Sequence, residues 1–249
     1  MIYVAGFLIA LAIGVTGVGG GTITVPVLML FLHLEPHKTV GTALAFAAAV
    51  KMLVAPVYIA RKQVSYRVLA LMATGGVPGL LAGLYFLHRL HSSHQNALLT
   101  ILIGLVITAT AVLNIFRVNR HGAQGTAVKD RSKWLPWIML PIGAEVGFSS
   151  AGAGAIGTLA LMNLTRLSPA QVVGTDVLFG LGLSLLGGGF QIATGSYDPA
   201  VLTQLVIGGI FGALIGPNLA AWAPSKPLRV ALCLWLATLG TMLCWHAAF

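Results

Sequence analysis

The chain has 249 residues, of which 57% are hydrophobic and only 8% charged, whereas soluble domains carry about 25% charged residues. This composition excludes an ordinary soluble protein, because too few polar side chains are available to cover its surface. The formal net charge of +9 would suit nucleic-acid binding, but the fourteen Lys and Arg residues lie almost entirely in short connections between apolar runs. That distribution is typical of proteins oriented in a membrane, so we expect no nucleic-acid partner.

Apolar runs long enough to cross a membrane occur along the whole chain. Crossing a bilayer as a helix takes about 20 mostly apolar residues, and residues 68–87, 97–116 and 201–222 each supply that many without a formal charge. The sequence therefore predicts an all-α, multi-pass integral membrane protein. Eight segments are expected, at residues 2–32, 40–60, 67–87, 97–116, 134–164, 172–193, 200–222 and 228–247.

The eight segments form two copies of one four-segment unit. LEPHKTVGTALAF at 34–46 returns as LSPAQVVGTDVLF at 167–179, so position 34 corresponds to position 167. At the same offset GGVPGLLAG at 75–83 becomes GGIFGALIG at 208–216. Such internal similarity predicts a duplicated architecture. We expect one integrated transport domain made of an N-terminal membrane repeat, a basic cytoplasmic linker and a C-terminal membrane repeat, at 1–116, 117–133 and 134–249.

The first segment of each copy is too long for one membrane helix. Its 31 residues would reach about 46 Å at 1.5 Å per residue, across a hydrocarbon core of about 30 Å. Glycines interrupt both segments, joined by a proline in the first, in GVTGVGGGTITVP at 14–26 and GFSSAGAGAIGT at 147–158. We predict two half-helices around an irregular turn in each. Interrupted segments at matching positions of two halves indicate the binding site of a transporter.

The basic residues favour an inverted arrangement of the two copies. If all eight segments cross the membrane, the connecting Lys and Arg residues divide eight against five between the two sides, which is a weak bias. If the two broken segments are re-entrant, only Lys38 and Arg89 oppose the other connecting charges, which is a clear positive-inside signal. We prefer this second topology, with both termini outside, and eight complete spans remain the alternative. The residues on the common side would be Arg61, Lys62, Arg67, Arg117, Arg120, Lys129, Arg131, Lys133, Arg166, Lys226 and Arg229.

The order of the glycine motifs resembles the TauE/SafE family of sulfite exporters. The motifs are GVGGG at 17–21, Val25-Pro26 and Gly41-Thr42 in the first copy, then VGTD at 173–176, GSYD at 195–198 and GGIFG at 208–212 in the second. The second copy departs from the pattern, because Leu159-Ala160 stands in place of the V-P. The resemblance implies a secondary transporter of the cytoplasmic (inner) membrane. It would carry a small anionic solute, such as sulfite, sulfoacetate, thiosulfate or another organosulfonate, usually without ATP.

The broken segments also supply candidate ligands for an anion. A half-helix N-terminus gathers unpaired N–H groups and about half a positive charge, and glycines let an anion approach that backbone. Close packing of small residues is the alternative interpretation, and it is the preferred one for 75–83 and 208–216. The predicted donors are Gly19, Gly20, Gly21, Thr22 and Thr24 in one copy and Ser149, Ser150, Gly152 and Gly154 in the other.

Five further side chains complete the predicted site. Thr42 and Thr175 occupy equivalent places where helix N-caps are expected, and they either cap their helices or contact substrate. Lys51, Glu145 and Asp176 lie inside apolar runs, where each costs about 2.5–3.5 kcal/mol unless solvated or paired. Lys51 would attract the anion, pair with Asp176, or do both. Glu145 and Asp176 are the candidate carriers of a coupling proton, unless they reach out to the membrane interface instead.

Other classes of protein fit the sequence less well. An intramembrane hydrolase lacks its nucleophile motif here, so we expect no enzyme and no catalytic residue. The glycine-rich string at 17–22 has no following Lys and no soluble βαβ unit, which nucleotide-binding loops require. No cofactor or metal is expected, and a homo-oligomer is compatible with the sequence but not implied by it. An anion channel that conducts without alternating access and a non-transporting subunit of a membrane complex remain alternatives.

Overall fold

The computed structural model describes residues 2–16, 20–92, 96–120, 131–150, 153–219, 234–235 and 237–245. Every regular element among these residues is a helix. In chain order they are α1 (Ile2–Thr16), α2 (Gly20–Leu32), α3 (Pro36–Ala60), α4 (Tyr66–Ser92), α5 (Asn96–Arg120), the short 3₁₀ helix η1 (Ser132–Trp134), α6 (Leu135–Ser149), α7 (Ala153–Leu164), α8 (Pro169–Ala193) and α9 (Pro199–Leu219). Residues 237–245 are also helical.

Four helices of the described chain, α3, α4, α8 and α9, are long and apolar enough to cross a membrane. α3 and α8 begin a few residues before the predicted segments, because Pro36 and Pro169 are preorganised for the first helical turn. Ser168 adds a capping box with Gln171 at the start of α8. The predicted all-helical, multi-pass architecture is therefore confirmed at this level.

The first segment of each predicted copy consists of two helices. α1 ends at Thr16 and α2 begins at Gly20, while α6 ends at Ser149 and α7 begins at Ala153. The prediction that the interruption extends to Pro26 is wrong, because Pro26 lies inside α2. Proline is tolerated within membrane helices, since neighbouring groups satisfy the carbonyl that it leaves unpaired.

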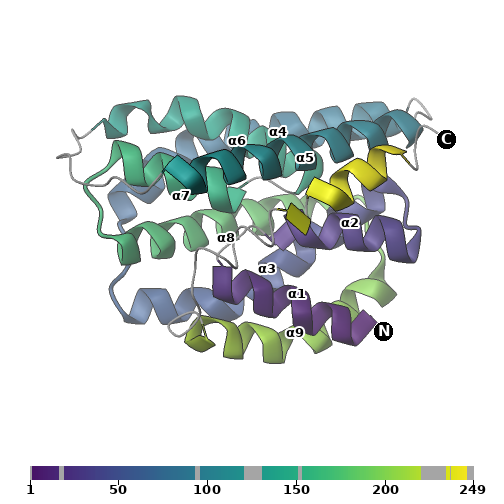
Figure 1. Cartoon of the computed structure of the whole chain (residues 1–249), viewed down its shortest axis with the longest axis horizontal. Coiled ribbons are helices and arrows are strands. Elements are labelled where there is room, and N and C mark those ends of the chain that lie inside the picture. Colours follow the sequence, from purple (N-terminus) through teal and green to yellow (C-terminus); the bar gives the residue numbers. More distant parts are fainter. Residues whose placement is uncertain are drawn as a thin grey trace.

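The helix bounds repeat at the offset that the sequence predicts. α1 (Ile2–Thr16) corresponds at both ends to α6 (Leu135–Ser149), and α3 (Pro36–Ala60) corresponds at both ends to α8 (Pro169–Ala193). The helices pack in corresponding pairs: α4 lies on α6 and α1 lies on α9. Figure 1 shows these two pairs along opposite edges of the molecule, with α3 and α8 between them. α3 and α8 also pack on each other.

Glycines allow the close approach within each outer pair. A Cβ atom on Gly79 of α4 would lie 2.0 Å from the carbonyl oxygen of Leu140 in α6, and one on Gly212 of α9 would lie 2.3 Å from that of Phe7 in α1. Both distances are too short for any real Cβ, so only glycine fits. The packing interpretation of 75–83 and 208–216 is therefore correct. In lipid the hydrophobic effect does not drive helices together, and close packing at small residues does so instead.

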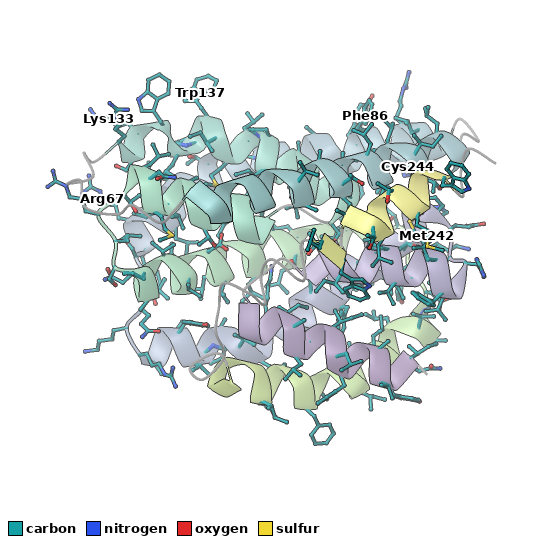
Figure 2. All side chains as sticks on the ribbon, in the orientation of Figure 1. Arg67, Phe86, Lys133, Trp137, Met242 and Cys244 are labelled. Carbon is teal, nitrogen blue, oxygen red and sulfur yellow. The ribbon has the colours of Figure 1, made fainter. Side chains whose placement is uncertain are left out.

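Large apolar side chains cover the outside of the molecule. Leu81, Tyr85 and Phe86 of α4 and Leu186 and Phe211 of α8 and α9 are all at least 52% exposed. Figure 2 shows many such side chains projecting outward from the helices. An exposed apolar surface of this kind would promote aggregation in water, whereas it matches the hydrocarbon interior of a bilayer.

Candidate functional site

The contact between α3 and α8 carries two buried charges, Lys51 and Asp176. The two helices run antiparallel, because Gly188 lies against Ala45 whereas Gly180 lies against Lys51. A Cβ atom on Gly180 would come within 2.4 Å of the Lys51 ammonium nitrogen. Lys51 is only 8% exposed, so its side chain lies across the α8 backbone, where the absence of a side chain at Gly180 leaves room for it.

Asp176 lies one turn before Gly180 on α8 and is 6% exposed. Its Oδ2 accepts a hydrogen bond from the Thr158 hydroxyl at 3.0 Å, and its Oδ1 is buried without a hydrogen-bond partner among the described residues. Oδ1 also lies against Gly157, where a Cβ atom would approach it to 2.6 Å. α7 therefore positions this carboxylate while leaving one of its oxygens available.

Lys51 and Asp176 influence each other electrostatically, but they do not form a direct ion pair. The ion pairs within 4.0 Å in the described chain join Glu35 to His37 and Lys38. The two buried charges thus face a common region between α3, α7 and α8 without neutralising each other by contact. This arrangement leaves both able to interact with a third group.

The charges occupy only one of two equivalent positions. At the offset between the two copies, Lys51 corresponds to Ser184, Gly180 to Ala47 and Asp176 to Ala43. The second position is therefore lined by a buried hydroxyl and two methyl groups. Because the same backbone frame is maintained there without any charge, the fold does not require the Lys51 and Asp176 charges.

The two interrupted segments approach each other closely. A Cβ atom on Gly21 of α2 would lie 1.9 Å from the carbonyl oxygen of Ser150 and 2.1 Å from its hydroxyl. Ser150 has a left-handed backbone (φ 59°) at the end of α6, and its buried hydroxyl has no hydrogen-bond partner in the part of the chain that the structure describes. α7 begins three residues later, so the N-termini of α2 and α7 come near each other.

Only some of the other predicted backbone and hydroxyl donors lie near the N-termini of α2 and α7. The Ser149 hydroxyl donates to the carbonyl of Glu145 at 3.0 Å within α6, so it is occupied locally. Thr22 and Thr24 are buried in α2. Gly20 and Gly154 belong to the first turns of α2 and α7, whereas Gly19 and Gly152 lie outside the described residues.

Thr42 and Thr175 join the two halves of the chain. The Thr42 hydroxyl accepts a hydrogen bond from the N–H of Asp198 at 3.0 Å, and the Thr175 hydroxyl accepts one from the N–H of Ser65, also at 3.0 Å. Ser65 and Asp198 are themselves equivalent positions of the two copies. The N-cap interpretation is wrong, because α3 and α8 begin at Pro36 and Pro169, six residues earlier.

The neighbouring glycines reinforce this reciprocal contact. A Cβ atom on Gly41 would lie 1.9 Å from the Ser196 carbonyl oxygen, and one on Gly174 would lie 2.1 Å from that of Gln63. Each Gly-Thr pair therefore holds the connection that precedes α9 or α4 in the opposite half. We call these two contacts, Gly41-Thr42 with 196–198 and Gly174-Thr175 with 63–65, the reciprocal loop contacts.

Glu145 belongs to a separate environment. Its carboxylate accepts a hydrogen bond from the hydroxyl of Thr110 on α5, and Thr110 is buried. Glu145 is therefore satisfied between α5 and α6, and the structure does not bring it together with Lys51 and Asp176 in any described contact.

Sequence reasoning missed Gly157, Thr158 and Gly180. Gly180 follows Asp176 by four residues, a spacing that places both on one face of a helix, so this signal was available. Gly157 and Thr158 lie within the glycine-rich stretch at 147–158, but nothing in the sequence indicates that they contact Asp176. Thr110 carries no signal beyond being polar within an apolar run.

Comparison with known proteins gives a consistent result over almost the whole chain. The family model described as "Sulfite exporter TauE/SafE" matches residues 2–243. The chain is 27% identical over 238 residues to "Probable membrane transporter protein YjnA" of Bacillus subtilis (strain 168), covering 92% of both chains. It is 26% identical over 241 residues to "Probable membrane transporter protein YdhB" of the same organism, covering 95% of this chain and 96% of the relative. No solved structure matches it significantly.

The reciprocal loop contacts yield a stability prediction. Thr42→Val preserves the shape of the side chain but leaves the Asp198 N–H without its acceptor, which costs about 1–3 kcal/mol. We expect a melting temperature several degrees lower in detergent micelles, measured by intrinsic fluorescence. Thr203→Val is the matched control, because the Thr203 hydroxyl is exposed and only donates to Pro199 of its own helix. Equal melting temperatures for the two variants would contradict a structural role for this bond.

Proposed function

The chain belongs to the sulfite exporter TauE/SafE family, and on that premise we propose that it is a secondary transporter of a small sulfur-containing anion in the cytoplasmic membrane. The candidate substrates are sulfite, sulfoacetate, thiosulfate and other organosulfonates. The observation that carries the proposal is the position of Lys51, whose ammonium lies across α8 beside Asp176. A buried cation without a direct ion pair is a suitable counter-charge for an anion that must leave water.

We propose that the anion lies between Lys51 and the N-termini of α2 and α7. Gly157 is four residues after the start of α7, a rise of about 6 Å along the helix, so the Asp176 region and the α7 N-terminus are close. The N–H groups of a helix N-terminus and the free hydroxyl of Ser150 are donors of the kind that oxyanions bind. The proposed donors are Gly19, Gly20, Gly21, Thr22, Thr24, Ser150, Gly152 and Gly154, with Thr42 and Thr175 holding the surrounding frame. Ser149 is left out, because its hydroxyl donates to the Glu145 carbonyl.

The duplicated helices support an alternating-access mechanism. We propose two repeats at 1–116 and 134–249, joined by the linker 117–133 and inverted relative to each other. α3 and α8 are equivalent in sequence yet run antiparallel, which is the relation expected from a two-fold axis in the membrane plane. In each outer pair, the third segment of one repeat (α4 or α9) packs on the first helix of the other (α6 or α1). Tilting of these pairs about α3 and α8 would expose the site to either side.

We further propose that a proton moves with the anion. Asp176 has an oxygen without a hydrogen bond beside Lys51, so it is the first candidate to carry the proton, and Glu145 is the second.

Lys51, Asp176 and Ser150 are all at most 8% exposed, so this conformation shields the region from solvent. Shielding is expected of a transporter between its two open states and not of a conducting channel.

The direct test of function is flux into proteoliposomes. We expect wild-type protein to take up labelled sulfite, thiosulfate or sulfoacetate with saturable kinetics and to respond to an imposed pH gradient. Lys62→Ala, at an exposed residue, should transport like wild type. Ohmic current without saturation would replace the transporter with an anion channel. Absence of any sulfur-anion flux from folded protein would overturn the proposed substrate class.

A second test addresses the place of Lys51. Gly180→Ala adds one methyl group where the Lys51 ammonium lies, and this end of a long side chain can move without unfolding the helices. We expect anion flux to fall by about tenfold, equivalent to about 1.4 kcal/mol, at unchanged melting temperature. Gly182→Ala is the matched control, because open space surrounds that position two residues along α8. Similar flux from both variants would remove Lys51 from the proposed site.

A further inference from the structure

A basic cavity lies at the end of the molecule where α4 and α6 begin. Its volume is about 610 Å³, and its lining includes Arg67 from α4 and Arg131 and Lys133 from the η1 region. Thr74, Ser132 and Trp134 complete its polar and aromatic wall. Figure 2 shows Arg67, Lys133 and Trp137 at this same end. The cavity is thus built by residues far apart in the sequence.

The two helices add to the positive potential of the cavity. α4 and α6 run parallel, because Gly75 contacts Pro136 and Gly83 contacts Ala144. Both N-termini therefore point to the same end, and each carries about half a positive charge. Among the described residues, the carboxylate ion pairs involve only Glu35, so Arg67, Arg131 and Lys133 have no such partner there. Asp130 lies outside the described residues.

The cavity lies where a membrane interface is expected. α4 is a candidate membrane span that begins at Tyr66, so its first turn is near the level of the lipid headgroups. Tyr66, Trp134 and Trp137 are 62%, 63% and 73% exposed, and aromatic side chains of this kind concentrate at membrane–water interfaces. The opening of the cavity is therefore next to lipid.

The charge of Arg67 is not a requirement of the fold. The equivalent place in the other half is where α9 begins on α1, and there Arg67 corresponds to Ala200 and Thr74 to Ile207. The two helix pairs have the same glycine contacts with and without these polar residues. Arg67 and Thr74 are therefore not needed to pack the helix pair, and ligand binding is a role that both can serve.

We propose that this cavity binds the phosphate of an anionic phospholipid headgroup. Arg67, Arg131 and Lys133 would hold the phosphate oxygens, in the way that basic pockets between membrane helices bind acidic lipids. Thr74 and Ser132 line the wall of the cavity, and Trp134 would lie against the glycerol backbone. A soluble oxyanion has the same chemistry, but the neighbouring exposed aromatic residues favour a ligand that is itself part of the bilayer.

The test is retention of phosphatidylglycerol during detergent exchange, measured by native mass spectrometry against phosphatidylcholine. We expect wild-type protein to bind phosphatidylglycerol at least tenfold more tightly than the double variant Arg67→Gln with Lys133→Gln. Arg61→Gln with Lys62→Gln is the matched control, because it removes two exposed charges from the connection just before α4. It should bind like wild type. If the double pocket variant does not fold, Arg67→Gln alone serves the same comparison.

Two results would overturn the proposal. Equal loss of phosphatidylglycerol from the pocket and control variants would mean that the lipid responds only to total surface charge. Displacement of the lipid by equimolar glycerol 3-phosphate or sulfate would identify a soluble anion as the ligand. Because lipid binding is measured without transport, failure of this proposal is distinguishable from failure of the proposed function.

Discussion

A lysine in the middle of an apolar helix is the constraint around which the charged region between α3 and α8 is built. Lys51 lies near the centre of α3 and is almost fully buried, and lipid offers it no hydrogen-bond partner. The protein accommodates it by placing a glycine opposite its ammonium and an aspartate one turn away on α8. Because neither α3 nor α8 can provide this environment alone, the charged region exists only where the two halves of the chain meet.

The remaining architecture serves to hold α3 and α8 in that relation. Glycines let α4 approach α6, and α9 approach α1, to backbone contact, while the reciprocal loop contacts fasten each half to the other. These are small-residue and hydrogen-bond contacts, which is what membrane proteins use where hydrophobic exclusion gives no driving force. Such contacts can be remade in a second arrangement without exposing apolar surface to water, which suits a protein proposed to alternate between two open states.

Much of this could be predicted from the sequence, because duplication is visible as a fixed offset. The offset located the helices and identified equivalent positions such as Thr42 and Thr175, and the membership in the TauE/SafE family is confirmed. It could not show which positions touch. Thr42 contacts Asp198 of the opposite half, a pairing set by three-dimensional packing, and the N-cap interpretation failed because Pro36 starts α3 earlier. The association of Lys51 with Asp176 was one of several open alternatives.

If Lys51 and Asp176 act as one unit on the transported anion, a double-mutant cycle on sulfur-anion flux will reveal their coupling. Lys51→Met and Asp176→Asn would be compared singly and together in proteoliposomes, with melting temperature as the check on folding. Each single variant should lose flux, and the double variant should lose no more than the worse of the two. Losses that multiply independently, or flux that survives either change, would contradict it.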